Sequence, residues 1–315
     1  MKVHASAGNE DIAMVYIVET SSGHLVECVE SVQPPLPREK KWVVLVSTMF
    51  GCPIGCLMCD AGGYYHGKPT KDEILAQIDF LVDKRFAGRN IPCEQFKIQF
   101  ARMGEPSLNL QVLDVLQELP QRYNAPGLLP SVSTVAPAHA GLFFDRLLEI
   151  KQQYYMGGHF QFQVSIHTTD TVLRDRFIPV NKWSFAEIAA YGNRFYAVGD
   201  RKITLNFALA HGMPVDPDVL LQFFDPAKFL IKITPLNPTY RARENDLVSY
   251  IDPLSGEQKY EIIQALQDSG YQVILSIGET EENYIGSNCG QYLRRHLSAD
   301  EPIEDGYTYQ VKEIP

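Results

Sequence analysis

The sequence lacks long apolar runs, an excess of basic charge and low-complexity segments. No part of the 315-residue chain approaches the roughly 20 consecutive apolar residues of a membrane-spanning helix, and no basic stretch followed by an apolar run opens it. We therefore expect a cytoplasmic protein with no membrane partner. The formal net charge of −10 disfavours broad adhesion to nucleic acid, because Lys and Arg must neutralise the phosphates. The 45% hydrophobic content excludes global disorder.

Cysteine is scarce, with six in the chain, but three lie within eight residues: Cys52, Cys56 and Cys59. Such a cluster indicates metal binding before disulfides in a chain with no secretion signal. Three thiolates on one loop can bind three irons of a four-iron cubane and leave the fourth iron open to a small molecule. The alternatives are a chance cluster of buried thiols and a zinc knuckle, for which His66 is a poor fourth ligand.

Short apolar runs alternate with longer amphipathic ones from about Val43 onward. This alternation predicts an α/β fold of βα units around a parallel sheet. The six predicted strands span 43–47, 96–101, 129–133, 161–166, 204–209 and 229–234. Because a closed barrel has eight such units, we expect a partial (β/α)6 barrel with its site at the carboxyl ends of the strands. Capping boxes predict helices that begin at Thr70, with Glu73, and at Ser255, with Gln258.

Three regions follow from this pattern. Residues 1–42 are expected to form an N-terminal extension, in which two apolar runs around Gly23 predict a β-hairpin from Ala13 to Ser31. Residues 43–293 form the partial barrel, and residues 294–315 form an acidic C-terminal tail.

Polar residues stand where four of the predicted strands end. The segment Met103 to Pro106 follows the second strand, and its glycine would let the backbone approach a ligand beside a carboxylate. The set comprises Gly104 and Glu105 in this segment, Ser133 at the end of the third strand, Ser165 and His167 at the end of the fourth, and Asn237 after the sixth. Each alone is most simply a turn former. Together, after four different strands, they indicate a binding site.

The spacing Cys-x3-Cys-x2-Cys from Cys52 to Cys59 resembles the signature of the radical S-adenosylmethionine superfamily. The resemblance implies a [4Fe-4S] cluster whose open iron binds S-adenosyl-L-methionine, and reductive cleavage of this cofactor to a 5′-deoxyadenosyl radical. It also implies an electron donor such as flavodoxin or ferredoxin.

The chain further resembles one family, the RlmN and Cfr type of radical methyltransferases that act on adenine in RNA. The matching segments run in family order over most of the chain: Met103 to Asn109, Val132 to Thr134, Val164 to His167, Leu173 to Asp175, Pro179 to Lys182, Ile233 to Pro238 and Asn288 to Gln291. By this resemblance Gly104, Glu105, Ser133, Ser165, His167 and Asn237 bind S-adenosylmethionine. Cys289 would accept a methyl group from the cofactor and then carry it to an electron-poor ring carbon.

Several residues depart from the family pattern. The family's second cysteine, which releases the product, would stand at Leu45, which is no thiol. A family glutamate that assists proton removal matches Glu27, beside Cys28. Adjacent residues of a strand face opposite ways, so Glu27 and Cys28 cannot both face the site. Met58 replaces the usual aromatic residue before the third cysteine.

The family's N-terminal helical RNA-recognition domain has no counterpart in the dozen residues before the hairpin, so RNA is disfavoured as the substrate. The leading hypothesis is a radical methyltransferase that uses Cys289 as methyl carrier toward an sp2 carbon of an unidentified substrate, with Glu27 as a second catalytic residue. One alternative is a radical enzyme that takes hydrogen directly from its substrate without methylating it. Another is an RNA adenine methyltransferase with atypical RNA recognition, and a third is a nonenzymatic cluster-bearing or RNA-binding protein.

Overall fold

The computed structural model describes residues 1–253, 260–288, 298, 301, 303 and 306–314. In these residues one sheet of eleven strands runs in the order β10-β9-β8-β7-β6-β5-β4-β3-β2-β1-β11. The strands are β1 (Lys2–Asn9), β2 (Ala13–Glu19), β3 (Leu25–Val32), β4 (Lys41–Val46), β5 (Gln95–Phe100), β6 (Leu128–Thr134), β7 (Gln161–Ser165), β8 (Ile203–Leu209), β9 (Phe229–Pro235), β10 (Val273–Leu275) and β11 (Lys312–Glu313).

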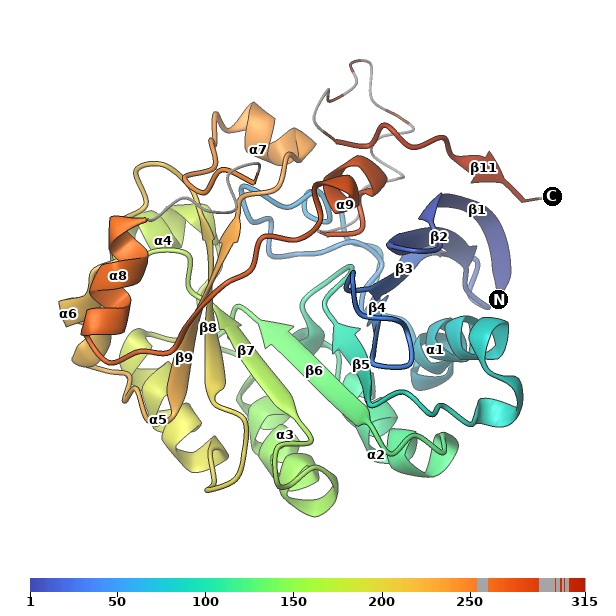
Figure 1. The fold of residues 1–315 in the computed structure, drawn as a ribbon, viewed down its shortest axis with the longest axis horizontal. Coiled ribbons are helices and arrows are strands. Elements are labelled where there is room, and N and C mark those ends of the chain that lie inside the picture. Colours follow the sequence, from blue (N-terminus) through green and yellow to red (C-terminus); the bar gives the residue numbers. More distant parts are fainter. Residues whose placement is uncertain (254–259, 289–297, 299–300, 302, 304–305, 315) are drawn as a thin grey trace.

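Strands β4 to β10 pair in parallel, which confirms the α/β class and the six predicted strands as β4 to β9. The short strand β10 extends the parallel part beside β9. Figure 1 shows β4 to β9 in an arc, with α1, α2, α3 and α5 along its outer side. The predicted partial barrel is therefore present, and the carboxyl ends of its strands meet at one rim.

Helices connect these strands. They are α1 (Lys71–Arg85), α2 (Gln111–Arg122), α3 (Gly141–Tyr154), α4 (Thr171–Phe177), α5 (Phe185–Phe195), α6 (Pro217–Leu221), α7 (Tyr240–Glu244), α8 (Glu261–Asp268) and α9 (Thr280–Ile285), with 3-10 turns η1 (Ala87–Arg89) and η2 (Pro106–Leu108). The predicted capping box at Thr70 is confirmed, since its side chain accepts from the Glu73 N–H and the Glu73 carboxylate accepts from the Thr70 N–H. The predicted box at Ser255 lies outside the described residues. Within the described ranges no helix is long and apolar enough to cross a bilayer.

The predicted hairpin is confirmed as β2 and β3, which pair antiparallel. Strand β3 continues onto β4, so the hairpin is the antiparallel end of the same sheet. The residues before the hairpin, for which no element was predicted, form β1 on the far side of β2. Residues from the expected C-terminal tail form β11 against β1. These edge strands place the chain termini at the end of the sheet opposite β10.

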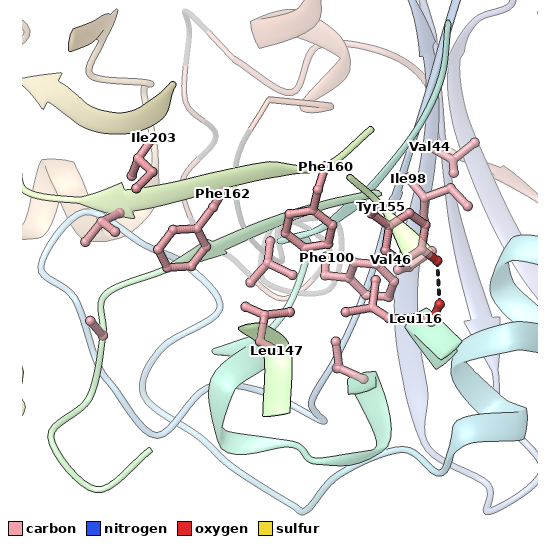
Figure 2. Packing of buried hydrophobic residues seen from close by; sticks show 14 of the residues in the cluster. Val44, Val46, Ile98, Phe100, Leu116, Leu147, Tyr155, Phe160, Phe162 and Ile203 are labelled. Atoms are coloured by element: carbon pink, nitrogen blue, oxygen red, sulfur yellow. Dashed lines mark hydrogen bonds between the residues drawn. The ribbon is translucent and has the colours of Figure 1, made fainter. Parts of the chain in front are cut away.

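The outer face of the barrel sheet carries the main hydrophobic core. Alternate strand residues such as Val44, Ile98 and Phe162 are buried against the helices, as Figure 2 shows. The Tyr155 hydroxyl donates to the Leu116 carbonyl, which joins α3 to α2 within this core. Burial of so much apolar surface is the main force that holds the helices on the sheet. The opposite, concave face of the strands is polar.

Candidate functional site

The cysteine loop begins at the carboxyl end of β4 and folds back on itself. Bridges join Gly51 to Tyr65 and Cys52 to Gly62. Gly51 has φ +85°, and a Cβ atom there would lie 2.2 Å from the Tyr64 carbonyl oxygen. Only glycine suits both conditions, so this residue closes the loop directly before the first cysteine.

The three cysteines lie close together and are half-buried, and Cys52 and Cys56 pack against apolar residues. Burial raises the pKa of Cys56 well above its usual range, and the neighbouring thiols of Cys59 and Cys52 raise it further. Burial also raises the pKa of Cys52 to about 11, although backbone N–H groups at Ile54 and Gly55 favour its thiolate. Without a metal, burial therefore favours the protonated thiols of Cys52 and Cys56. A bound metal would hold them as thiolates and release protons.

The donor set of this loop fits an iron–sulfur cluster. A zinc site draws its ligands around one ion, whereas three cysteines of a cubane each bind a different iron. Ile54, Phe177 and Leu236 provide the apolar surroundings of the thiols.

A short helix after β9 holds the cysteine loop from outside. The Thr239 hydroxyl donates to the Met58 carbonyl at 2.7 Å, and the Asn245 side chain donates to the Leu57 carbonyl at 3.1 Å. The buried Asp60 carboxylate accepts from the backbone N–H of Arg241 at 2.9 Å, at the start of α7. This acceptor lies where the N-terminal N–H groups of a helix need one. Loop and helix therefore position each other.

The loop after β5 packs directly on the start of the cysteine loop. The Met103 carbonyl accepts from the N–H groups of Thr48 and Met49 at 2.8 and 3.1 Å. Gly104 has φ +94°, and a Cβ atom there would lie 2.4 Å from the Met49 side chain. The absence of a side chain at Gly104 thus lets the backbone of this loop lie close to Met49.

Glu105 links the ends of β5 and β6. Its buried carboxylate accepts from the hydroxyls of Ser107 and Thr134 at 2.6 and 2.5 Å and from the Val135 N–H at 2.9 Å. Burial raises the pKa of Glu105, and these hydrogen bonds lower it. The negative charge of Glu105 also raises the pKa of Cys52 and Cys56, so its carboxylate lies beside these cysteines.

His167 follows β7 in an unusual backbone conformation, with φ +66°. Its Nδ1 accepts from the Ala208 N–H at 3.0 Å, so Nε2 is the N–H donor of the neutral ring. Burial lowers the pKa of His167 to about 3, and the nearby Arg174 charge acts in the same direction. The ring is therefore uncharged at neutral pH and offers one hydrogen-bond donor at the rim.

The remaining strand-end residues surround the same rim. The Ser133 hydroxyl on β6 is buried and has no hydrogen-bond partner among the described residues. A buried hydroxyl without a partner costs free energy that a ligand could recover. Ser165 ends β7 and pairs with Asn206 of β8. Asn237 lines two cavities of about 590 and 200 Å³ beyond β9.

Glu27 lies in a buried ion pair with Arg102. Nη2 of Arg102 donates to the Glu27 carboxylate at 2.7 Å and to the Gly286 carbonyl at 2.9 Å, while Nη1 donates to the Ser287 carbonyl at 3.2 Å. Asn288 lines the 200 Å³ cavity together with Asn237. Cys289 itself lies outside the described residues. The segment that leads to it is held at the rim by Arg102.

Neither Cys28 nor Leu45 provides a second thiol on the concave side of the sheet. Cys28 is fully buried in the main core on the outer face, and burial raises its pKa. Leu45 packs beside Val29 in a separate apolar cluster. This confirms that Glu27 and Cys28 point to opposite faces of β3.

Sequence reasoning missed the residues that hold these loops together: Arg102, Asp60, Thr239 and Asn245. The only sign of Arg102 in the sequence was its position directly before the Met103 to Pro106 motif. The partners of Asp60 stand about 180 residues away in the chain, so no local pattern could reveal them.

Comparisons with known proteins give relatives over most of the chain, although no protein-family model matches it. The chain is 25% identical over 295 residues to the probable dual-specificity RNA methyltransferase RlmN of Trichormus variabilis, covering 92% of this chain and 75% of that protein. It is 28% identical over 288 residues to the protein of the same name from Chlorobium phaeobacteroides, covering 89% and 74%.

A solved structure matches the fold. The crystal structure of a radical SAM methyltransferase from Sphaerobacter thermophilus superimposes with a TM-score of 0.69 at 21% identity, covering 87% of this chain and 76% of that one. The partial barrel, the cysteine loop at its rim and the relatives in sequence agree with one another. The chain is therefore similar in sequence to RlmN-type RNA methyltransferases over most of its length, and it shares the fold of a radical SAM methyltransferase.

Proposed function

We propose that this chain is a radical S-adenosylmethionine enzyme that holds a [4Fe-4S] cluster at Cys52, Cys56 and Cys59. The observation that carries the proposal is the proximity of the three half-buried thiols at the carboxyl end of β4, where Cys59 and Cys52 both act on Cys56. Apolar residues pack against Cys52 and Cys56. Hydrogen bonds from α7 hold the loop in place from outside.

The residues at the rim would bind the cofactor: Gly104, Glu105, Ser133, Ser165, His167 and Asn237. When bound, cluster and S-adenosylmethionine supply a 5′-deoxyadenosyl radical for hydrogen abstraction. Ser133 offers a buried hydroxyl that has no partner in the described residues, and His167 offers its Nε2 N–H. Glu105 orders the loops that follow β5 and β6.

The proposed reaction is methyl transfer to an sp2 carbon, with Cys289 as the methyl carrier. Two observations support this role for a residue outside the described ranges. Arg102 anchors the carbonyls of Gly286 and Ser287, and Asn288 lines the cavity that also contains Asn237. The RlmN relatives are named as RNA methyltransferases. Glu27, paired with Arg102, would assist proton movement beside this segment.

The test is anaerobic reconstitution of the cluster, followed by addition of dithionite and S-adenosylmethionine. The assay measures 5′-deoxyadenosine and S-adenosylhomocysteine together. We expect both products, loss of both in Cys56→Ala, and loss of S-adenosylhomocysteine in Cys289→Ala. Cys93→Ala, which replaces a buried thiol of the outer core, is the matched control and should keep both products. Neither product from the reconstituted wild type would refute the proposal.

A second candidate is direct hydrogen abstraction without methyl transfer. The family uses a cysteine at this position to resolve its covalent intermediate, whereas this chain has Leu45, which packs in an apolar cluster. Cys28 faces the other side of the sheet and cannot replace that cysteine. An adduct without a resolving thiol would trap the enzyme. Formation of 5′-deoxyadenosine without S-adenosylhomocysteine, unchanged in Cys289→Ala, would favour this candidate.

RNA is the substrate that the names of the relatives suggest, and the net charge of −10 works against it. A third arm of the assay therefore adds transfer and ribosomal RNA and measures methyl incorporation from labelled S-adenosylmethionine. Incorporation into RNA would establish an RNA methyltransferase with atypical recognition. Flavodoxin or ferredoxin in place of dithionite tests the proposed electron donor.

A further inference from the structure

The concave face of the barrel sheet has an unusual composition. In a strand, alternate residues point to the same face, and the register pairs Val43 with Lys97, Lys97 with Leu129, and Asn206 with Lys232. The residues of β4 to β9 that share this face are Lys41, Val43, Leu45, Gln95, Lys97, Gln99, Leu129, Ser131, Ser133, Gln161, Gln163, Ser165, Thr204, Asn206, Ala208, Leu230, Lys232 and Thr234. They include three lysines, many amides and hydroxyls, and no carboxylate, in a chain whose net charge is −10.

Lys97 is the central cation of this face. Its ammonium has neither a hydrogen bond nor an ion pair with any residue that the structure describes. The charged groups that act on it are Lys232, Lys41 and Arg201, all cationic. Burial lowers the pKa of Lys97 to about 7, and these three neighbours lower it further. Lys97 is half-buried on this face, so a ligand in the barrel can reach its ammonium, and an anion there would supply the missing counter-charge.

The neighbouring cations have different surroundings. Lys41, at the start of β4, donates to the Gln33 side chain, and Arg201, before β8, donates to the Gly158 carbonyl. Glu282 approaches Lys232 from α9 and is itself sensitive to the Lys232 charge. None of these contacts reaches Lys97, so they do not provide its counter-charge.

We propose that the concave face carries an anion-binding site centred on Lys97, and that its ligand is the phosphate group of a small molecule. Several cations that act on Lys97 favour a divalent anion over a single carboxylate, because attraction grows with the charge of the anion. Gln99, Ser131 and Gln163 share the face and can donate hydrogen bonds to phosphate oxygens. A bound phosphate would also keep Lys97 charged. The site does not depend on methyl transfer, and it stands or falls separately from the proposed function.

The test measures anion binding by calorimetry on the full-length, cluster-free chain. The probes are inorganic phosphate, ribose 5-phosphate and acetate. We expect saturable binding of phosphate or ribose 5-phosphate, and binding at least about tenfold weaker in Lys97→Met, equivalent to about 1.4 kcal/mol. Acetate should bind far more weakly than either. Lys71→Met, on the outer helix α1, removes the same charge far from the barrel interior and should bind like the wild type.

Stability provides a second readout. Without ligand, Lys97→Met should be at least as stable as the wild type, because it removes a charge that only other cations surround and that has no partner in the described structure. Phosphate should raise the melting temperature of the wild type and leave that of Lys97→Met unchanged. Lys97→Gln repeats the comparison if the methionine variant fails to fold. Tighter binding of ribose 5-phosphate than of phosphate assigns the site to a phosphate ester, and the reverse order assigns it to free phosphate. Equal phosphate binding in wild type and Lys97→Met, or no saturable binding in the wild type, would overturn the proposal.

Discussion

The Glu27 carboxylate on β3 and the Arg102 guanidinium after β5 are joined at 2.7 Å in a fully buried ion pair. Arg102 continues from this pair to the carbonyls of Gly286 and Ser287. One arginine thus connects the antiparallel hairpin, the loop next to the cysteines and the segment that precedes Cys289. The proposed methyl carrier depends on this connection.

Removal of Arg102 should strongly destabilise the fold. Arg102→Met leaves the Glu27 carboxylate buried beside an apolar side chain, so we expect the free energy of unfolding to fall by about 3–5 kcal/mol. Urea unfolding followed by circular dichroism measures the change. The double variant Glu27→Met with Arg102→Met should cost less than the sum of the two single variants.

The control for this prediction is the exposed pair of Arg194 and Asp145. Arg194→Met should cost no more than about 1 kcal/mol, because water already solvates both charges. Equal costs for the two arginines would contradict the role assigned to the buried pair.

Gly104 should not accept a side chain. Gly104→Ala combines φ +94° with a Cβ atom 2.4 Å from Met49, so the loop after β5 must shift away from the cysteine loop. We expect a loss of about 2 kcal/mol in unfolding free energy and weaker binding of S-adenosylmethionine in equilibrium dialysis. In Gly141→Ala at the start of α3, where the added Cβ meets open space, stability should be unchanged or slightly higher. A Gly104→Ala protein as stable as the Gly141 variant would show that the loop tolerates the shift.

The contacts from α7 should slow the loss of the cluster. Asn245→Ala removes the hydrogen bond to the Leu57 carbonyl within the cysteine loop. We expect the reconstituted variant to lose iron to a chelator several-fold faster than the wild type, as followed by the charge-transfer absorbance of the cluster. Asn193→Ala, which removes a surface contact with Lys228, should lose iron at the wild-type rate. If both variants matched the wild type, the contacts of α7 would not govern retention.

His167 should make stability depend on pH below neutrality. Its folded-state pKa is about 3, whereas an unfolded histidine has a pKa of about 6.5. Between these values the unfolded chain binds one more proton than the folded chain, so stability falls as the pH decreases from 6.5 towards 3. His167→Asn, whose side chain tolerates positive φ, should reduce that slope in urea unfolding at pH 5 and pH 7. The exposed His139→Asn is the matched control, and an unchanged slope in His167→Asn would refute the assignment.

The sequence by itself determined the parts of this protein that depend on local pattern. Alternating apolar runs identified β4 to β9 because each strand must bury one face against helices, and Thr70 with Glu73 identified the start of α1 because a helix needs acceptors for its first N–H groups. The spacing of Cys52, Cys56 and Cys59 sufficed to indicate a cluster because three thiolates on one loop need no distant partner.

Tertiary structure alone decided how the loops at the rim are joined and which charges are buried. Arg102 meets Glu27 across 75 residues and Ser287 across 185, and Asp60 meets α7 across about 180. Such contacts leave no periodic trace, since they depend on the order of strands in the sheet. Lys97 reads as an ordinary strand lysine until the curvature of the sheet encloses it among other cations. Burial and proximity, which set the pKa of Lys97 and His167, are properties of the folded chain.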